Sequence, residues 1–298
     1  MEILLHSYID VLISVVLAAI MFGLGLSLTL SNFKDIIKFP RAFFVGLASQ
    51  MIFLPAIAFV ILLFADIPGP FKVGIMILAA CPGGTTSGFV TYLLKGNVAL
   101  SIALTVINSF LTLFTIPFIV NFSLKYYLHQ EVEIHLPFFE SVTQIFLITL
   151  LPAILGLFVR KTKPLFATAI QKYLKFILIA LLALVYTIKF FAGDQHGGSG
   201  ITVDEVWTIL PYALIFNILC FVFSIGFGKL TKLKIRDAFT IALEVSLHNT
   251  TLALLIGGTF LQSQDMIKPA LIYTMFSFWT AIIFGFIILK LYKTEFQR

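Results

Sequence analysis

The chain has 298 residues, of which 60% are hydrophobic and only 11% are charged, and its mean hydropathy is +1.06. A soluble domain of this size could not have this composition, because it would offer too little polar surface to water. We therefore predict an integral membrane protein of the all-α class, whose surroundings are the lipid bilayer.

Nine apolar stretches are long enough to cross the bilayer as helices, because about 20 helical residues span its hydrocarbon core. Together they predict a single transmembrane unit over residues 1–298. In chain order the stretches are Tyr8–Leu30, Arg41–Phe64, Phe71–Leu94, Val98–Phe122, Phe138–Val159, Ile170–Phe191, Val206–Leu230, Arg236–Leu261 and Met266–Tyr292.

The charged residues are unevenly distributed between the two sides of these stretches. All but four of the 20 lysines and arginines fall on one side, whereas ten of the 14 acidic residues fall on the other. Basic residues collect on the cytoplasmic side of membrane proteins. We therefore predict a multi-pass protein of the cell (inner) membrane, with the N-terminus outside and the C-terminus in the cytoplasm. The net charge of +6 reflects this topology, and no nucleic acid partner is predicted.

The third stretch contains a segment, Cys81–Gly88, that does not suit a continuous helix. Pro82 removes a backbone donor, and the two following glycines, Gly83 and Gly84, loosen the next turn. Three hydroxyl residues then offer partners to the freed backbone groups: Thr85, Thr86 and Ser87. This pattern predicts a break in the helix rather than a simple proline kink.

The eighth stretch is interrupted by polar residues around Glu244, the only acidic residue away from the ends of the hydrophobic runs. An ionisable group at this depth costs at least about 2.5 kcal/mol unless it lines a cavity or finds a partner. On a continuous helix Glu244 and His248 would share a face, so a structural Glu–His pair is one interpretation. The crowding of other polar side chains nearby favours a functional site: Ser246, Asn249, Thr250 and Thr251.

The third and eighth stretches are five apart in chain order, an odd number, so they run in opposite directions through the membrane. This arrangement is typical of an inverted repeat in which two discontinuous helices cross near the midplane. The N-terminal ends of half-helices favour anions, whereas their C-terminal ends and unwound carbonyl groups favour cations. One such crossing could bind both kinds of ligand.

Four segments together resemble the bile acid:sodium symporter family. They are Met21–Leu30, Cys81–Ser87, Thr91–Ser101 and Glu244–Asn249, and the resemblance extends to about Trp279. It implies a panel domain over about 8–30 and 138–191, and a core domain over about 41–122 and 206–292 that contains both discontinuous helices.

The resemblance also implies a set of ligands. A first sodium ion would bind Ser87, Ser101, Thr105 and Glu244, and a second would bind Gln50, Glu244 and backbone oxygens from Val245 to Leu247, beside His248. Oxygen is the ligand that a hard cation such as sodium prefers. The anionic group of a substrate would contact Gly84, Thr85, Thr86, Asn249 and Thr250.

Two positions depart from the family pattern. Gly88 stands where the family usually has asparagine, and His248 stands where it usually has glutamine. Each change removes an amide oxygen from one of the implied cation sites. A protonated imidazole could replace one sodium ion, so we expect fewer sodium ions per cycle and pH-sensitive transport.

The sequence therefore predicts a secondary active transporter, acting as a monomer, that imports a bile-acid-like or small carboxylate anion with one or two sodium ions. The alternative is a proton-coupled or sodium-independent transporter of organic anions on the same fold. An intramembrane enzyme is disfavoured, because the predicted spans contain neither a second histidine nor a His-Glu-x-x-His pattern.

Overall fold

The computed structural model describes residues 2–29, 40–128, 135–193 and 197–296, and within these ranges the regular elements are helical. Seven helical runs are long and apolar enough to cross a membrane. The protein is therefore a multi-pass membrane protein. The runs are α1 (Glu2–Ser27); α3 (Pro40–Ala48), η1 (Ser49–Phe53) and α4 (Leu54–Leu63); α7 (Val98–Tyr127); α8 (Phe138–Ile145), η2 (Phe146–Leu150) and α9 (Leu151–Thr162); α10 (Pro164–Phe191); α11 (Val203–Leu230); and α14 (Gln264–Leu291), which the short α15 (Lys293–Phe296) follows.

The other two predicted spans are not continuous helices. The third consists of α5 (Gly69–Ala80) and α6 (Thr85–Leu93), and the eighth of α12 (Ile235–Ser246), α13 (Thr250–Leu254) and η4 (Leu255–Phe260). The chain thus leaves the helical conformation at both predicted breaks. Because these short helices do not qualify as membrane spans by length, the count of nine spans and the inverted repeat stay predictions.

Local chemistry explains where the four half-helices begin and end. Cys81 precedes a proline and is extended, with φ −76° and ψ 138°, so α5 ends at Ala80. Leu247 likewise leaves the helical region, with φ −110° and ψ 81°. The side chain of Asn249 then accepts a hydrogen bond from the backbone N–H of Leu252 and caps α13.

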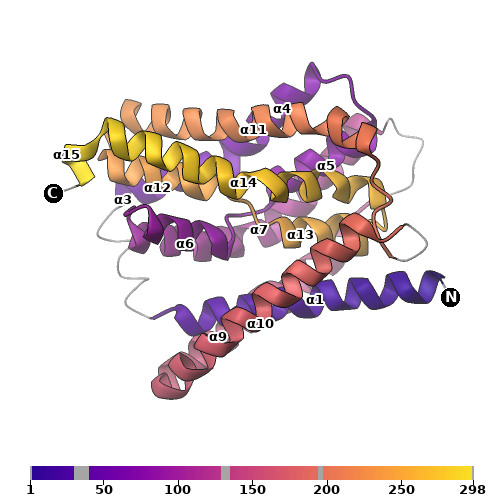
Figure 1. Cartoon of the computed structure of the whole chain (residues 1–298), viewed down its shortest axis with the longest axis horizontal. Helices are drawn as coiled ribbons and strands as arrows, with labels where there is room; N and C mark the ends of the chain where they lie inside the picture. Colours follow the sequence, from indigo (N-terminus) through magenta and orange to yellow (C-terminus); the bar gives the residue numbers. More distant parts are fainter. Residues whose placement is uncertain (1, 30–39, 129–134, 194–196, 297–298) are drawn as a thin grey trace.

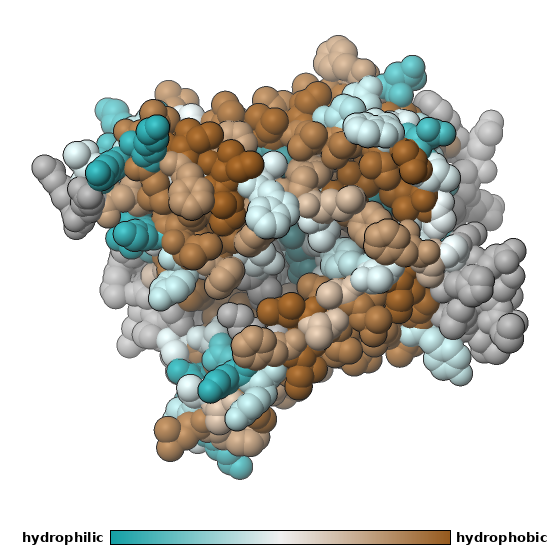
Figure 2. All heavy atoms as spheres, in the orientation of Figure 1, coloured by the Kyte–Doolittle hydropathy of each residue, from teal (hydrophilic) through white to brown (hydrophobic). Residues whose placement is uncertain are grey.

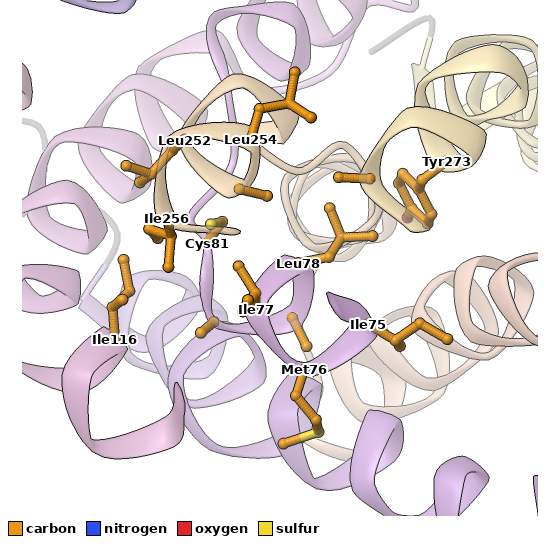
Figure 3. Packing of buried hydrophobic residues seen from close by; sticks show 14 of the residues in the cluster. Ile75, Met76, Ile77, Leu78, Cys81, Ile116, Leu252, Leu254, Ile256 and Tyr273 are labelled. Carbon is orange, nitrogen blue, oxygen red and sulfur yellow. The ribbon is translucent and has the colours of Figure 1, made fainter. Parts of the chain in front are cut away.

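The helices form two groups (Figure 1). Helix α1 packs along α9 and α10, and these three helices lie together on one side of the molecule. In the other group, α5 packs against α4, α7 and α14. Ile75 and Leu78 of α5 belong to the same buried cluster as Leu252 and Ile256 of the second broken helix and Tyr273 of α14 (Figure 3). Both broken helices are therefore embedded in the larger group.

Large apolar side chains cover much of the outer surface. Phe118, Phe158, Trp279 and Phe286 are each more than 60% exposed, and hydrophobic residues dominate the face in Figure 2. Such a surface suits contact with lipid tails. On the same face, a hollow between α14 and α10 shows more hydrophilic residues.

One ion pair lies inside the smaller helix group. Lys189 of α10 is completely buried, and its Nζ atom lies 3.7 Å from Oδ1 of Asp10 on α1. This ion pair therefore links α10 to α1 inside the smaller helix group.

Candidate functional site

The two breaks meet and are joined by backbone hydrogen bonds. The N–H of Gly84 donates to the carbonyl of Leu247 at 3.1 Å, and the N–H of Asn249 donates to the carbonyl of Pro82 at 2.8 Å. Gly83 and His248 face each other as an antiparallel bridge. The breaks thereby satisfy each other's backbone groups, which apolar surroundings would otherwise leave unpaired.

The close approach at this crossing occurs at Gly83. A Cβ atom added there would lie 2.4 Å from Oε2 of Glu244, whereas one added at Gly84 would lie 3.6 Å from its nearest neighbours, in ordinary contact. The tight contact at the crossing is therefore with the carboxylate of Glu244, and it occurs at Gly83. Gly84, the glycine expected to contact the substrate, has room for a methyl group.

Glu244 is completely buried and accepts hydrogen bonds from three hydroxyl groups. Its donors are Ser87 at 2.8 Å, Thr105 at 3.0 Å and Ser101. Ser87 comes from α6, while Ser101 and Thr105 lie one turn apart on α7. The four residues expected at a first sodium site therefore form one cluster of a carboxylate and three hydroxyl oxygens, a donor set that suits a hard cation.

Gln50 lies in the π-helical turn η1, which packs against α7 and α12. The amide oxygen of Gln50 accepts a hydrogen bond from Nδ2 of Asn108. The side-chain partner of Gln50 is thus Asn108 and not Glu244. Unlike the residues expected at the first sodium site, Gln50 is therefore not hydrogen-bonded to Glu244. Asn108 was not among the predicted ligands, although it follows Thr105 by three residues on the same helix.

The backbone oxygens expected at the second sodium site lie at the C-terminal end of α12. Val245 is buried within α12, and the carbonyl of Leu247 already accepts from Gly84. Between them, the carbonyl of Ser246 accepts from Tyr273 at 2.6 Å and from Asn217 at 3.1 Å. Asn217 on α11 and Tyr273 on α14 thus fix this end of α12. The sequence analysis did not identify either residue, because no local pattern indicates that they donate to the distant carbonyl of Ser246.

His248 does not form the helical pair with Glu244. Helix α12 ends at Ser246, so the two residues do not share a helical face, and the carboxylate is hydrogen-bonded to hydroxyl groups instead. The imidazole stacks on Phe216, with 5.4 Å between the ring centres and 9° between the planes, and it lies beside Tyr273. The interpretation as a structural Glu–His pair is therefore wrong.

The residues expected to contact a substrate lie at the starts of α6 and α13. Thr86 is exposed, and Thr85 begins α6 but its side chain lies outside the described part of the chain. The hydroxyl of Thr250 lies 2.5 Å from that of Tyr186 on α10. Tyr186, which the sequence did not single out, joins the smaller helix group to the second broken helix.

A second set of bonds ties the first broken helix to the start of α12. Arg236 donates to the carbonyls of Lys95 and Gly96, each at 3.1 Å, and Asn97 donates to Asp237 at 2.8 Å. The loop after α6 is thereby fixed to α12. Together with the contacts at Glu244 and at the crossing, these bonds hold α6, α7 and α12 as one unit.

Comparison with known proteins shows that the chain is similar to a family of transporters. The model of the sodium bile acid symporter family matches residues 14–196, which is more than half of the chain. The uncharacterized sodium-dependent transporter YocS of Bacillus subtilis is 27% identical over 92% of this chain and 81% of its own length. The ileal sodium/bile acid cotransporter of Mus musculus is 26% identical over 98% and 81%, respectively.

The match to a plant relative covers less of that relative's length. The probable chloroplastic sodium/metabolite cotransporter BASS1 of Arabidopsis thaliana is 26% identical over 80% of this chain, and the match spans only 56% of BASS1. The members of the matched family are transporters and not enzymes. The family model, the two broken helices and the buried Glu244 cluster lead to one conclusion. This chain belongs to the sodium bile acid symporter family.

Proposed function

We propose that this protein is a secondary active transporter that carries an organic anion into the cell together with one or two sodium ions. The observation that carries the proposal is the buried carboxylate of Glu244 surrounded by the hydroxyls of Ser87, Ser101 and Thr105. A cation bound there would neutralise an expensive buried charge and coordinate only to oxygen. The relatives support this coupling ion and substrate class, since YocS is named as sodium-dependent and the ileal cotransporter is named for sodium and bile acid.

The substrate's anionic group would bind beside the crossing, where α6 and the α13–η4 half-helix begin. Helix N-termini carry partial positive charge and unpaired N–H groups, which attract anions. Gly84, Thr86, Asn249 and Thr250 lie there, and Thr85 opens α6. A bile-acid-like or small carboxylate anion fits this chemistry.

Movement of the two helix groups relative to each other would alternate access to the site. We assign α1, α8, η2, α9 and α10 to a panel and the remaining helices to a core, since α1 packs along α9 and α10. Sodium would order the crossing and raise the affinity for the anion, and the coupling would be reciprocal. In this proposal nine spans cross the inner membrane of a monomer, with the N-terminus outside.

Uptake into proteoliposomes tests the coupling ion directly. Radiolabelled taurocholate and pyruvate would serve as a bile acid and a small carboxylate, with external sodium chloride or choline chloride across a pH series. We expect at least one anion to accumulate with sodium and not with choline. Accumulation in choline that follows an inward proton gradient would favour the proton-coupled alternative instead.

Gly88 allows a test of the first sodium site. A Cβ atom there would contact only Ser101 Oγ, at 3.6 Å, so a side chain can start at this position without a clash. Gly88→Asn would add an amide oxygen next to the Glu244 cluster. We expect the sodium concentration for half-maximal uptake to fall several-fold in this variant. A change of this size is on the order of the free energy of one added contact to a charge. Gly88→Ala is the control, because it adds the Cβ atom without the oxygen and should leave that concentration unchanged. Equal concentrations for the wild type, Gly88→Asn and Gly88→Ala would contradict the assignment of the first sodium site.

A further inference from the structure

Gln50 and Asn108 form a buried amide pair beside the Glu244 cluster. Their side chains are 2% and 0% exposed, and Nδ2 of Asn108 donates to Oε1 of Gln50. Within the described part of the chain, the remaining two polar atoms, Oδ1 of Asn108 and Nε2 of Gln50, are buried without a hydrogen-bond partner. Such atoms are rare in folded proteins, because each costs about 1–3 kcal/mol.

The unpaired oxygen does not depend on how the two amides are oriented. If both amides were turned over, Nε2 of Gln50 would donate to Asn108, and the oxygen of Gln50 would lose its donor instead. Either arrangement leaves one carbonyl oxygen of the pair free to accept. A cation could use this free oxygen as a ligand.

The position of the pair agrees with a cation site. Asn108 lies three residues after Thr105, whose hydroxyl donates to Glu244 at 3.0 Å, so Asn108 continues the face of α7 that carries Ser101 and Thr105. The turn η1, which holds Gln50, packs against both α7 and α12. An ion between these elements would therefore lie close to the negative charge of Glu244.

We propose that the side-chain oxygen of Asn108 is a sodium ligand in this protein, acting with Gln50 and Glu244. It takes the place of the amide oxygen that is missing where His248 stands, since the imidazole stacks on Phe216 instead. A second sodium ion is therefore retained, whereas Gly88 and His248 alone led us to expect fewer sodium ions per cycle. This inference rests on the proposed sodium coupling.

Sodium-dependent thermal stabilisation of the purified protein tests the inference without any substrate. Sodium chloride would replace choline chloride at constant ionic strength while the unfolding temperature is measured. Asn108→Leu keeps the size of the side chain and removes the oxygen. We expect it to raise the sodium concentration for half-maximal stabilisation by at least about tenfold, the scale of one lost contact to a charge.

Two further variants make the outcome decisive. Asn108→Asp keeps an oxygen and should not raise that concentration, even if Asn108→Leu does not fold. Thr112→Val lies one turn further on α7, where the threonine hydroxyl donates to the carbonyl of Ser109, and it should leave the sodium response unchanged. An unchanged response in Asn108→Leu, or a weakened one in Asn108→Asp, would overturn the role of Asn108 alone. Absence of any sodium response in the wild-type protein would overturn the proposed coupling as well.

Discussion

Replacing Glu244 with glutamine is expected to abolish sodium-driven uptake and the stabilisation that sodium gives to the purified protein. The amide keeps the size of the carboxylate and one acceptor for the surrounding hydroxyls, so the variant should fold. It lacks the negative charge that would pair with the cation. Removing one partner of a buried charge pair costs about 3–5 kcal/mol, so sodium binding should weaken at least about 100-fold.

Glu140→Gln is the matched control for this experiment. Glu140 is an exposed acid near the start of α8, far along the chain from the crossing. Its replacement removes the same charge without touching the cluster, and uptake should stay at the wild-type rate. Wild-type sodium dependence in Glu244→Gln, measured by uptake and by thermal unfolding, would show that the carboxylate is not a ligand.

Gly83→Ala is expected to have the second largest effect, although it adds a single methyl group. The new Cβ atom would lie 2.4 Å from Oε2 of Glu244 and 3.1 Å from its carbonyl oxygen. Either the backbone crossing or the carboxylate must then move away from its hydroxyl partners. We expect a loss of about 1–3 kcal/mol in stability, typical of overpacking, and a rise of at least about tenfold in the sodium concentration that stabilises the protein.

The next residue supplies the control for this substitution. Gly84→Ala places its Cβ atom 3.6 Å from the nearest atoms, Asn249 Cα and the His248 carbonyl oxygen, and keeps the N–H that donates to Leu247. Sodium titrations of the two alanine variants should therefore differ clearly. If both variants bind sodium like the wild-type protein, the crossing tolerates side chains and Gly83 has no special role.

The sequence was sufficient to locate both breaks and the central carboxylate. Pro82 removes a backbone donor and the two glycines after it weaken a helix, and Glu244 stands out because an isolated acid is costly in an apolar run. Ser101 and Thr105 have helical spacing on an adjacent stretch, and the structure brings them to Glu244 with Ser87. These features depend on local chemistry, which a sequence displays directly.

Other parts of the site depend on contacts between distant segments. Asn217 and Tyr273 stabilise the carbonyl of Ser246 from two separate helices, and each looks like an ordinary residue in its own stretch. The helical spacing that links Glu244 to His248 was misleading, because α12 ends between them. The ligand roles are tested by the experiments above, whereas the panel and core assignment and the topology stay predictions.

The pairing of Asp10 with Lys189 has an electrical consequence. The membrane potential does about 2.3 kcal/mol of work on each elementary charge moved through 100 mV. A lone lysine in α10 would make every displacement of that helix sensitive to voltage. Because Lys189 lies 3.7 Å from Asp10 on the adjacent α1, the two helices together carry a neutral pair there. This ion pair should therefore add little to the voltage dependence of transport.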